Sequence, residues 1–394
     1  MIPYVYPEQI FLKSTTMDST FLQPSYIELD YQALEENIRF LQSMGSDQLK
    51  ISSVIKGNAY GHGISSFLPM AEKAGIDHFS VFSVNEAERA IRHKTNKDTV
   101  IMIIGMIRDD EIEWAIHNGI EIYLFEQDRL HAAIRAGKRT GMRAKVHLQL
   151  ETGMNRTGFD EKELKKVIEI LKSNSDTIEV VGICTHFAGA ETIANHYRIQ
   201  NQDKIFRELV KWVQNELGQE LLVHASSSAA FLTYPEKHYD MVRIGIAQYG
   251  FWPSRETYMY HIKNEGLNGD IDPLRRVLTW KSEVMSLKKV KGGDFVGYGN
   301  VFLAGHDMTI ATVPIGYTHG FGRNLTNTGY VLIKGVRCGV VGLVSMNMIT
   351  VNVSHVDDVQ KGDEVVLIGK QGKDEITVAS FGEMTNDLNY EVLT

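Results

Sequence analysis

Eight short apolar runs, separated by stretches with helical periodicity, occupy the chain between residues 51 and 244. The runs are Ile51–Ile55, His78–Phe82, Val100–Ile104, Glu121–Leu124, Lys145–Leu150, Glu179–Thr185, Leu221–His224 and Asp240–Ile244. Strand-length segments that alternate with helices are typical of βαβ units, and eight such units close into a barrel. A further helix precedes them, because Asp30 can cap a segment in which Leu34, Ile38 and Leu41 share one face. The sequence therefore predicts an α/β fold with a (β/α)8 TIM-like barrel.

Near Ile271 the pattern changes to short strands separated by Gly and Asp turns, which predicts a C-terminal all-β domain. The candidate strands are Val284–Leu287, Thr309–Val313, Tyr330–Ile333, Cys338–Val344, Ile349–Asn352 and Glu364–Ile368. The polar segment Asn264–Asp270 contains glycine and is the expected linker. We expect an N-terminal extension over residues 1–24, a barrel over 25–268 whose first strand could join the β domain, and a β domain over 269–394.

The composition excludes several classes of protein. The chain has 394 residues, 43% hydrophobic and 23% charged, so it can bury a core in each of two domains. A net charge of −8 does not indicate binding to nucleic acid or to a membrane, and no apolar run approaches the ~20 residues of a transmembrane helix. The two cysteines, Cys184 and Cys338, are too few for a disulfide framework and suit a reducing compartment. Since residues 1–23 do not look like a signal peptide, we expect a cytoplasmic protein.

The first predicted strand delivers Lys56 directly into the glycine-containing turn Gly57–Gly63. An ammonium group at the end of a buried strand carries a desolvation cost, which is removed when the lysine forms a Schiff base with a carbonyl. Burial also lowers the pKa of a lysine, so that the neutral, nucleophilic amine is populated. On position alone, the alternative is a solvated lysine at a strand end.

The residues around Lys56, Val54-Ile-Lys-Gly-Asn-Ala-Tyr-Gly-His-Gly63, resemble the cofactor-lysine motif of the alanine racemase family. The resemblance implies that Lys56 binds pyridoxal 5'-phosphate and that Tyr60 contacts its phosphate. A second segment, 240–250, resembles the family's motif in which an arginine, here Arg243, bonds the pyridine nitrogen. A guanidinium does not give up its proton in proteins, so the ring would remain a weaker electron sink. Without the flanking match, Arg243 could equally form a strand-end salt bridge.

The same resemblance places the remaining cofactor contacts. Ser228 and the backbone N–H groups of Gly245 and Ile246 would bind the phosphate, with a further contact from Tyr390. Loops after the seventh and eighth strands are the usual phosphate site of barrels, which agrees with this placement. His186, in Thr-His-Phe-Ala, would pack near the ring and support the arginine. As an isolated histidine, it could equally be structural.

Five of these residues follow predicted strands. Lys56, Arg156, His186, Ser228 and Arg243 follow or end the first, fifth, sixth, seventh and eighth strands. Barrel enzymes place their catalytic groups at the carboxyl ends of strands, so we expect the five to meet at one rim.

Racemisation requires a second base on the face opposite Lys56. Tyr298, in Phe-Val-Gly-Tyr-Gly, resembles the family's catalytic tyrosine, although a tyrosine by itself is more often a packing residue. A phenol has a pKa near ~10 and needs a cationic neighbourhood to act at neutral pH. In the family this tyrosine reaches the active site of the partner subunit, which implies a head-to-tail homodimer with active sites at the interface.

The family pattern also assigns the substrate contacts, and this chain departs from it at three positions. Arg156, the backbone of Met346 and the entrance residue Tyr317 would contact the substrate, with the arginine fork matching a carboxylate. The chain has Gln149 in place of a lysine that many members carbamylate, Asn347 in place of aspartate and Ser227 in place of asparagine. Gln149 cannot be carbamylated, but its amide oxygen could accept a bond from Arg156, or a bound anion could replace the carbamate.

The resemblance thus implies alanine racemase activity, which would interconvert L- and D-alanine through a pyridoxal phosphate aldimine and two bases, and would supply D-alanine for peptidoglycan. One alternative is a broad-specificity racemase that accepts serine or larger side chains. Less favoured are a basic amino-acid decarboxylase and a non-catalytic pyridoxal-phosphate-binding protein, because neither needs the tyrosine motif. No cluster has zinc-ligand spacing, so we expect no catalytic metal.

Overall fold

The computed structural model describes residues 4–5, 23–265, 272–385 and 388–394. It divides into two compact units: a barrel unit, Gln32–Arg276, and a β unit that combines Met1–Tyr31 with Val277–Thr394. Most of the expected N-terminal extension and of the expected linker lies outside the described residues. No helix in the described ranges is long and apolar enough to cross a membrane.

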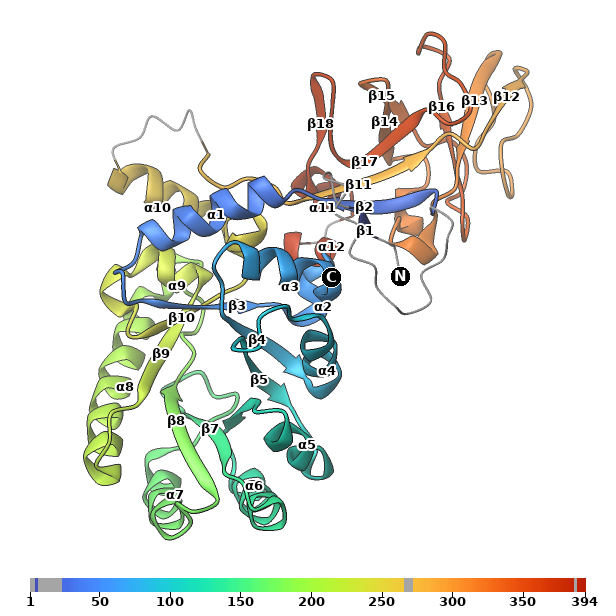
Figure 1. Cartoon of the computed structure of the whole chain (residues 1–394). Helices are drawn as coiled ribbons and strands as arrows, with labels where there is room; N and C mark the ends of the chain where they lie inside the picture. Colours follow the sequence, from blue (N-terminus) through green and yellow to red (C-terminus); the bar gives the residue numbers. More distant parts are fainter. Residues whose placement is uncertain (1–3, 6–22, 266–271, 386–387) are drawn as a thin grey trace. The chain divides into compact units, whose positions relative to one another are not determined.

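The barrel unit contains a closed parallel barrel with the strand order β10-β3-β4-β5-β6-β7-β8-β9 (Figure 1). Its strands are β3 (Lys50–Val54), β4 (His78–Ser83), β5 (Val100–Met106), β6 (Glu121–Leu124), β7 (Ala144–Gln149), β8 (Ile178–Cys184), β9 (Leu222–Ser227) and β10 (Met241–Ile244). All eight predicted strands are present, and the predicted fold class is confirmed. The barrel closes because β10 pairs in parallel with β3.

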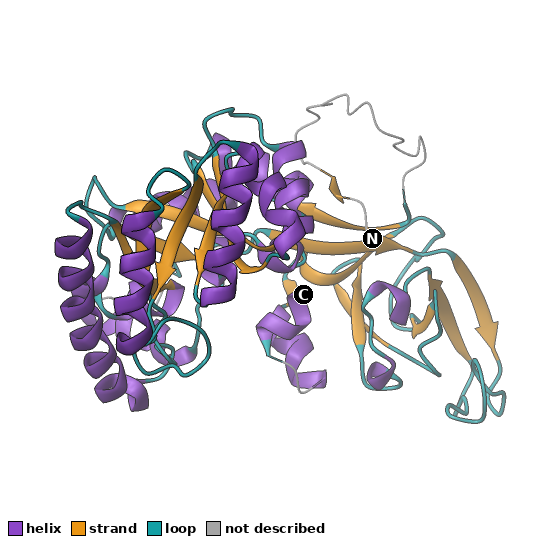
Figure 2. Ribbon diagram, turned by 90° about the horizontal axis from the view of Figure 1, so that it is seen from below, coloured by secondary structure: helices purple, strands orange, loops and turns teal. Residues whose placement is uncertain are grey.

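Helices surround these strands (Figure 2). They are α1 (Tyr31–Ser43), α2 (Lys56–Tyr60), α3 (Ile64–Lys73), α4 (Val84–His93), α5 (Ile112–His117), α6 (Gln127–Thr140), α7 (Glu161–Ser173), α8 (His196–Leu217), α9 (Ser228–Thr233) and α10 (Arg255–Glu265). The predicted apolar face of α1 is buried through Leu34, Ile38 and Leu41. Helix α7 begins where the Asp160 carboxylate accepts bonds from two backbone N–H groups of the first turn, which are otherwise unpaired.

The β unit contains two sheets. A seven-stranded sheet has the order β1-β2-β11-β17-β14-β15, with β18 paired to β17, and a three-stranded sheet has the order β12-β13-β16. The strands are β1 (Tyr4–Val5), β2 (Ser25–Leu29), β11 (Leu278–Glu283), β12 (Ser286–Val290), β13 (Met308–Val313), β14 (Tyr330–Ile333), β15 (Val336–Gly339), β16 (Ile349–Asn352), β17 (Glu364–Gln371) and β18 (Asp374–Ile376). Two helices, α11 (Val378–Thr385) and α12 (Asn389–Leu393), complete the unit.

Strand β11 was not among the predicted strands. It pairs antiparallel with β2 on one side and with β17 on the other. Its sequence, Leu-Thr-Trp-Lys-Ser-Glu, alternates buried residues with partly or fully exposed ones, but the polar Ser282 stands at one of the buried positions. Lys281 is accommodated because its ammonium lies 2.7 Å from Glu28 and 3.1 Å from Glu364 on the flanking strands. Cross-strand ion pairs of this kind cannot be recognised before the strand order is known.

Candidate functional site

The barrel brings the five predicted rim residues to the carboxyl ends of five consecutive strands. In barrel order these are β7, β8, β9, β10 and β3. Lys56 lies two residues after Val54, the last residue of β3, and Arg243 lies within β10, opposite Ser52 of β3. His186 follows β8, and Ser228 begins α9 immediately after β9. Parallel strands in a closed barrel share one carboxyl end, so these side chains belong to one rim.

Charges at this rim act on one another. Burial, together with the positive charges of Arg243, Arg156 and Lys56, lowers the pKa of His186 to about 3. The Nη2 of Arg243 lies 3.4 Å from Nδ1 of His186. Burial lowers the pKa of Lys56. The positive charges of Arg156 and Arg243 also lower this pKa, whereas the negative charge of Glu86 raises it. A lysine in such surroundings populates its neutral, nucleophilic amine at a lower pH than a free lysine does.

Lys56 opens an unusual backbone segment. Gly57, Asn58, Ala59 and Tyr60 all have left-handed dihedral angles, with φ values of 61°, 53°, 57° and 50°. The amide of Ala59 bonds the carbonyl of Ile55 at 2.8 Å, so the segment is a left-handed helical turn. Each non-glycine residue in this conformation costs roughly 1–2 kcal/mol. Lys56 begins this segment and Tyr60 ends it, so the conformation of the turn decides how the two residues are placed relative to each other.

The Tyr60 hydroxyl meets the turn that follows β10. A Cβ atom at Gly245 would lie only 2.6 Å from Tyr60 Oη, so the hydroxyl occupies the space that glycine leaves open. The amide of Gly245 donates to Ser228 Oγ at 2.9 Å, and the amide of Ala247 lies 3.5 Å from the same oxygen. Hydroxyl and amide groups from three segments therefore gather at one point. This donor set suits a phosphate group.

Arg243 is held by a chain of buried polar side chains that runs across the barrel interior. Its Nη1 lies 2.6 Å from Nδ1 of His224, and Nε2 of His224 lies 2.9 Å from Nδ1 of His147. Nε2 of His147 then bonds Glu121 at 2.8 Å, and Nε2 of His78 lies 3.3 Å from the same carboxylate oxygen. The chain links β10, β9, β7, β6 and β4.

The donors and acceptors of this chain fix its tautomers. A guanidinium can only donate, so Nδ1 of His224 accepts and its Nε2 carries the hydrogen. Nδ1 of His147 then accepts, and its Nε2–H donates to Glu121. His224 is therefore neutral, which agrees with burial and the Arg243 charge lowering its pKa well below the usual value. The neutral imidazole holds Arg243 without competing for its proton.

Sequence analysis did not assign roles to His224, His147, Glu121 or His78. A signal was present, because each is a polar residue within, or at the end of, an apolar strand that was expected to be buried. In a barrel strand, alternate residues face the interior, and buried polar groups need partners. The hydrogen-bond partners could not be identified from the sequence, because the bonded residues belong to different strands and lie 26 to 77 positions apart in the chain.

The segment after β7 is organised by its own side chains. Gln149 Nε2 donates to Thr157 Oγ1 at 2.9 Å and lies 3.3 Å from the Thr157 carbonyl oxygen. The Glu151 carboxylate accepts from the amides of Asn155, at 2.8 Å, and Arg156, at 3.4 Å. In the described part of the chain, the bonds of Gln149 thus run to Thr157 and not to the Arg156 side chain that the sequence suggested.

The β unit carries the other predicted site residues. Tyr298 lies between Gly297 and Gly299, both with positive φ, and the residue is 74% exposed. Tyr317 and Met346 lie in neighbouring loops, which are tied together because the amide of Tyr317 bonds the Ser345 carbonyl at 3.2 Å. Tyr390 lies in α12. Their predicted contacts with the cofactor and the substrate stay predictions.

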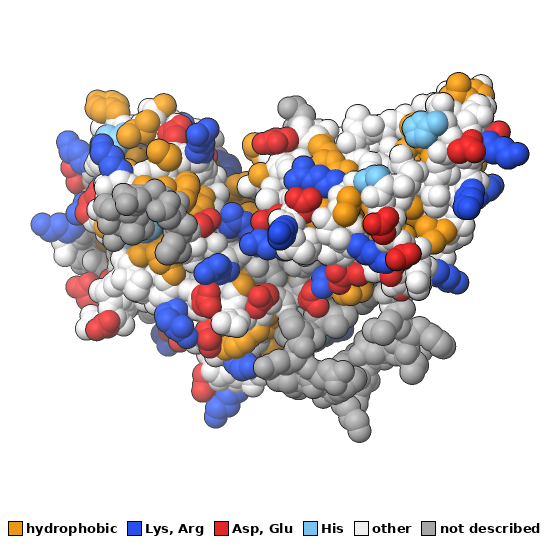
Figure 3. Space-filling model, turned by 90° about the horizontal axis from the view of Figure 1, so that it is seen from above, with side chains coloured by type: hydrophobic (Ala, Val, Ile, Leu, Met, Phe, Trp, Pro, Cys, Tyr) orange, Lys and Arg blue, Asp and Glu red, His pale blue; other side chains and the backbone are white. Residues whose placement is uncertain are grey.

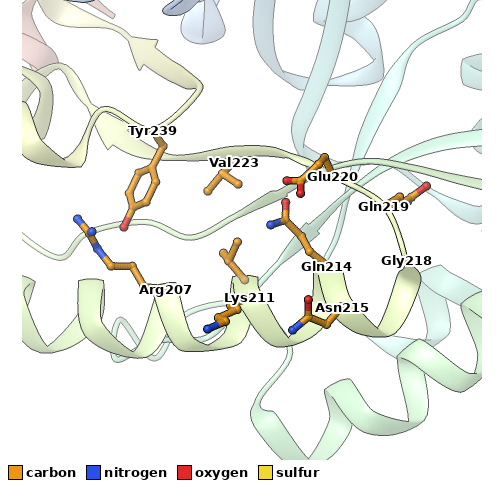
Figure 4. Close-up of a pocket in the computed structure, with 10 residues that line it drawn as sticks. Arg207, Lys211, Gln214, Asn215, Gly218, Gln219, Glu220, Val223 and Tyr239 are labelled. Carbon is orange, nitrogen blue, oxygen red and sulfur yellow. The ribbon is translucent and has the colours of Figure 1, made fainter.

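A surface pocket on the barrel unit lies away from this chemistry. Arg207, Lys211 and Gln214 of α8 line it together with Val223 and Tyr239 (Figure 4). Val223 is the second residue of β9 and Tyr239 precedes β10, so the pocket lies at the amino ends of these strands, opposite the rim. On the face in Figure 3, basic and acidic side chains are interspersed.

A closed parallel barrel with a lysine of lowered pKa after β3 and a cluster of hydroxyl and amide groups after β9 and β10 is typical of barrel enzymes, which place their sites at this rim. The comparisons narrow this class. Residues 29–253 match the model of the alanine racemase N-terminal domain, and residues 277–394 match that of the C-terminal domain. The chain belongs to the alanine racemase family.

Individual relatives cover nearly the whole chain. Alanine racemase from Symbiobacterium thermophilum is 34% identical over 96% of each chain, and that from Leptospira interrogans is 31% identical over 97% of this chain and 95% of its own. The crystal structure of Bacillus anthracis alanine racemase with bound L-Ala-P is similar with a TM-score of 0.84, at 30% identity over 95% of this chain and 93% of that one. The structure from Bartonella henselae, with covalently bound pyridoxal phosphate, gives a TM-score of 0.77 at 26% identity, covering 94% of this chain and 96% of that one.

Proposed function

We propose that this protein is a pyridoxal-phosphate-dependent alanine racemase that interconverts L- and D-alanine. The observation that carries the proposal is the convergence of Lys56, Tyr60, Gly245, Ser228 and Arg243 at one barrel rim. Lys56 would hold the cofactor covalently, while Tyr60 Oη, Ser228 Oγ and the amides of Gly245 and Ile246 would bind its phosphate. The role of Tyr390 as a further phosphate contact is part of the proposal.

When bound, pyridoxal phosphate withdraws electrons from the substrate's α-carbon and so makes its proton acidic. Arg243 would face the pyridine nitrogen as a pure hydrogen-bond donor, because the neutral His224 and the distant carboxylate of Glu121 leave its charge in place. His186 would lie beside the ring in its neutral form, since its pKa is lowered to about 3.

The two bases are assigned to the two faces of the substrate. Lys56 Nζ would remove or return the proton of the D-isomer, and Tyr298 Oη that of the L-isomer. Arg156 and the backbone amide of Met346 would bind the substrate carboxylate, with Tyr317 at the entrance. A charge-assisted fork of this kind fixes the α-carbon between the two bases.

The proposal includes a head-to-tail homodimer in which Tyr298 serves the partner's site. It is supported by the large exposure of Tyr298 in a loop whose flanking residues Phe295 and Leu303 are also exposed apolar side chains. Contiguous apolar exposure of this kind marks interaction surfaces. A cytoplasmic location and the supply of D-alanine for peptidoglycan belong to the same proposal.

A second candidate, a racemase of broader specificity, is favoured by one observation. Gln149 bonds Thr157, so the segment that carries Arg156 is not oriented by a carbamylated lysine. Such a segment could accept serine or larger side chains.

Two measurements test these assignments. The purified protein is incubated with each L-amino acid in turn, and the D-isomer is measured by chiral chromatography. We expect alanine to be racemised fastest, and comparable rates with serine or larger substrates would support the second candidate. Borohydride reduction of the cofactor-loaded protein, followed by peptide mapping, should locate the cofactor on Lys56, and attachment to another lysine would refute the site.

A further inference from the structure

Helix α4 holds the left-handed turn Gly57–Tyr60 through Asn58. The amide of Asn58 donates to Glu86 Oε1 at 3.2 Å, and its side-chain Oδ1 accepts from Arg89 Nη1 at 2.8 Å and from the amide of Ile64 at 3.2 Å. The other Glu86 oxygen accepts from the amide of Phe82 at 2.8 Å. One carboxylate therefore ties the turn to the end of β4.

We propose that Glu86 and Arg89 are positioning residues that hold this turn so that Lys56 and Tyr60 reach the cofactor together. The inference deepens the proposed function and rests on it. A run of left-handed residues persists only where its surroundings determine it. Glu86 and Arg89 are three residues apart on α4 and therefore lie on one face of the helix. Together they engage both parts of Asn58: Glu86 accepts from its backbone amide, and Arg89 donates to its side-chain oxygen.

The position of Glu86 gives it a second effect, on charge. The cations that act on Lys56 are Arg156, from the segment after β7, and Arg243, from β10, while His186 faces them in its neutral form. Among the described residues, Glu86 is the acidic group that acts on the Lys56 ammonium. Removing its charge leaves the two arginines unopposed, so the neutral amine of Lys56 should form at a lower pH.

The substitution Glu86→Gln separates this role from ordinary packing. A carboxylate accepts at both oxygens, whereas the amide of glutamine accepts at one and donates at the other. The variant can therefore satisfy the amide of Asn58 or that of Phe82, but not both. Glu88→Gln is the matched control, because Glu88 lies on the same helix and its carboxylate pairs with the exposed Arg92.

Three readouts are compared between these variants and the unmodified protein. In cofactor-free full-length protein, hydrogen exchange of the peptide spanning residues 56–63 should be about tenfold faster in Glu86→Gln, since bonds to charged groups are the strong ones. The pH midpoint for capture of added pyridoxal phosphate by the cofactor-free protein should fall by about one unit. The kcat for alanine should fall roughly ten- to a hundredfold, with KM within about twofold, because the lysine is misplaced and the carboxylate site is intact.

Arg89 provides an independent variant if Glu86→Gln folds poorly by circular dichroism. Arg89→Met removes the donor to Asn58 and should speed exchange of residues 56–63, whereas Arg89→Lys retains a donor and should restore slow exchange. Both keep the Glu86 charge, so neither should move the pH midpoint by more than a few tenths of a unit. This difference distinguishes the effect of the hydrogen bonds to Asn58 from the effect of the Glu86 charge on Lys56.

The outcomes are separable from those of the proposed function. If Glu86→Gln matches Glu88→Gln in all three readouts, or if Arg89→Met exchanges as slowly as the unmodified protein, the inference is wrong. If the unmodified protein captures no pyridoxal phosphate on Lys56, the proposed function fails, and hydrogen exchange in the cofactor-free protein still decides whether α4 holds the turn.

Discussion

The barrel unit and the β unit present their site residues in opposite ways. In the barrel, Arg243 bonds His224 and the backbone carbonyls of Thr185 and Ala225, so its direction is set by its own unit. In the β unit, Tyr298 lies at the tip of a loop and is 74% exposed. The barrel thus orients its proposed site residues before any ligand arrives, while the role proposed for Tyr298 depends on the partner subunit that the proposal includes.

The comparison predicts its largest effect at Lys56. Lys56→Ala should abolish racemisation in both directions, because the barrel offers no second amine on this turn. Exchange of the α-proton in deuterated water, followed by NMR, should be lost for both isomers. Substantial exchange in this variant would mean that another group of the barrel performs the chemistry assigned to Lys56.

Replacing the exposed tyrosine should have a smaller and one-sided effect. Tyr298→Phe should slow racemisation by roughly 10²- to 10⁴-fold, which is the usual contribution of a positioned acid or base. The same NMR measurement should still show faster exchange for D-alanine than for L-alanine. Equal losses for both isomers would argue against bases on opposite faces, and would remove the distinction between the two units.

Within the barrel, the segment after β7 should show a graded effect on substrate binding. Arg156→Ala should raise KM by about 10- to 150-fold through the loss of a charge-assisted contact worth about 1.5–3 kcal/mol. Gln149→Ala should raise KM less, because Gln149 acts through its bonds to Thr157. Steady-state kinetics with and without bicarbonate should be identical, since no lysine is present to carbamylate. Indifference of KM to both substitutions would show that Arg156 does not bind the carboxylate.

Acid should destabilise the barrel unit more than the β unit. In the barrel unit, burial lowers the pKa of His62 to about 4, and burial with nearby positive charges lowers that of His186 to about 3. In the described part of the β unit, His319 is the histidine with a lowered pKa. Between pH 6.5 and 4 these histidines are protonated in the unfolded chain but remain neutral in the folded barrel. As the pH falls through this range, the free energy of unfolding of the barrel therefore decreases by up to about 1.4 kcal/mol per pH unit for each such histidine.

This difference can be measured by denaturant titrations at pH 7.5 and 5.0, with pulsed hydrogen exchange at one fixed labelling pH. Peptides from the barrel should lose protection at a lower denaturant concentration at pH 5.0, and His62→Gln should reduce the shift. Glu121 does not contribute in this window: burial alone would raise its pKa, but the bonds from His147 and His78 outweigh burial and keep the pKa well below the usual value. Equal shifts in the two units would contradict the assignment.

The sequence predicted the fold class because its signals are local. Apolar runs of strand length and the periodicity of α1 depend on near neighbours, and all eight barrel strands were found within a few residues of their ends. Strand β11 was missed because the polar Ser282 occupies a buried position of its alternation, and the Ser25 hydroxyl that bonds it lies far away in sequence. The predicted strand Cys338–Val344 was placed too late, since β15 spans Val336–Gly339.

For the site, the sequence by itself determined which residue types stand at the ends of which strands, and motif resemblance alone assigned roles to Lys56, Arg243 and Tyr298. The tertiary structure decided what surrounds them. Two sets of hydrogen bonds join residues from different strands and helices: the chain from Arg243 through His224 to Glu121, and the bonds of Glu86 and Arg89 to Asn58. The neutral state of His224 follows from the first set. Hydrogen bonds and charges act over a few ångströms in space whatever the separation along the chain, so only folding reveals which groups share a low-dielectric interior and how they shift one another's protonation.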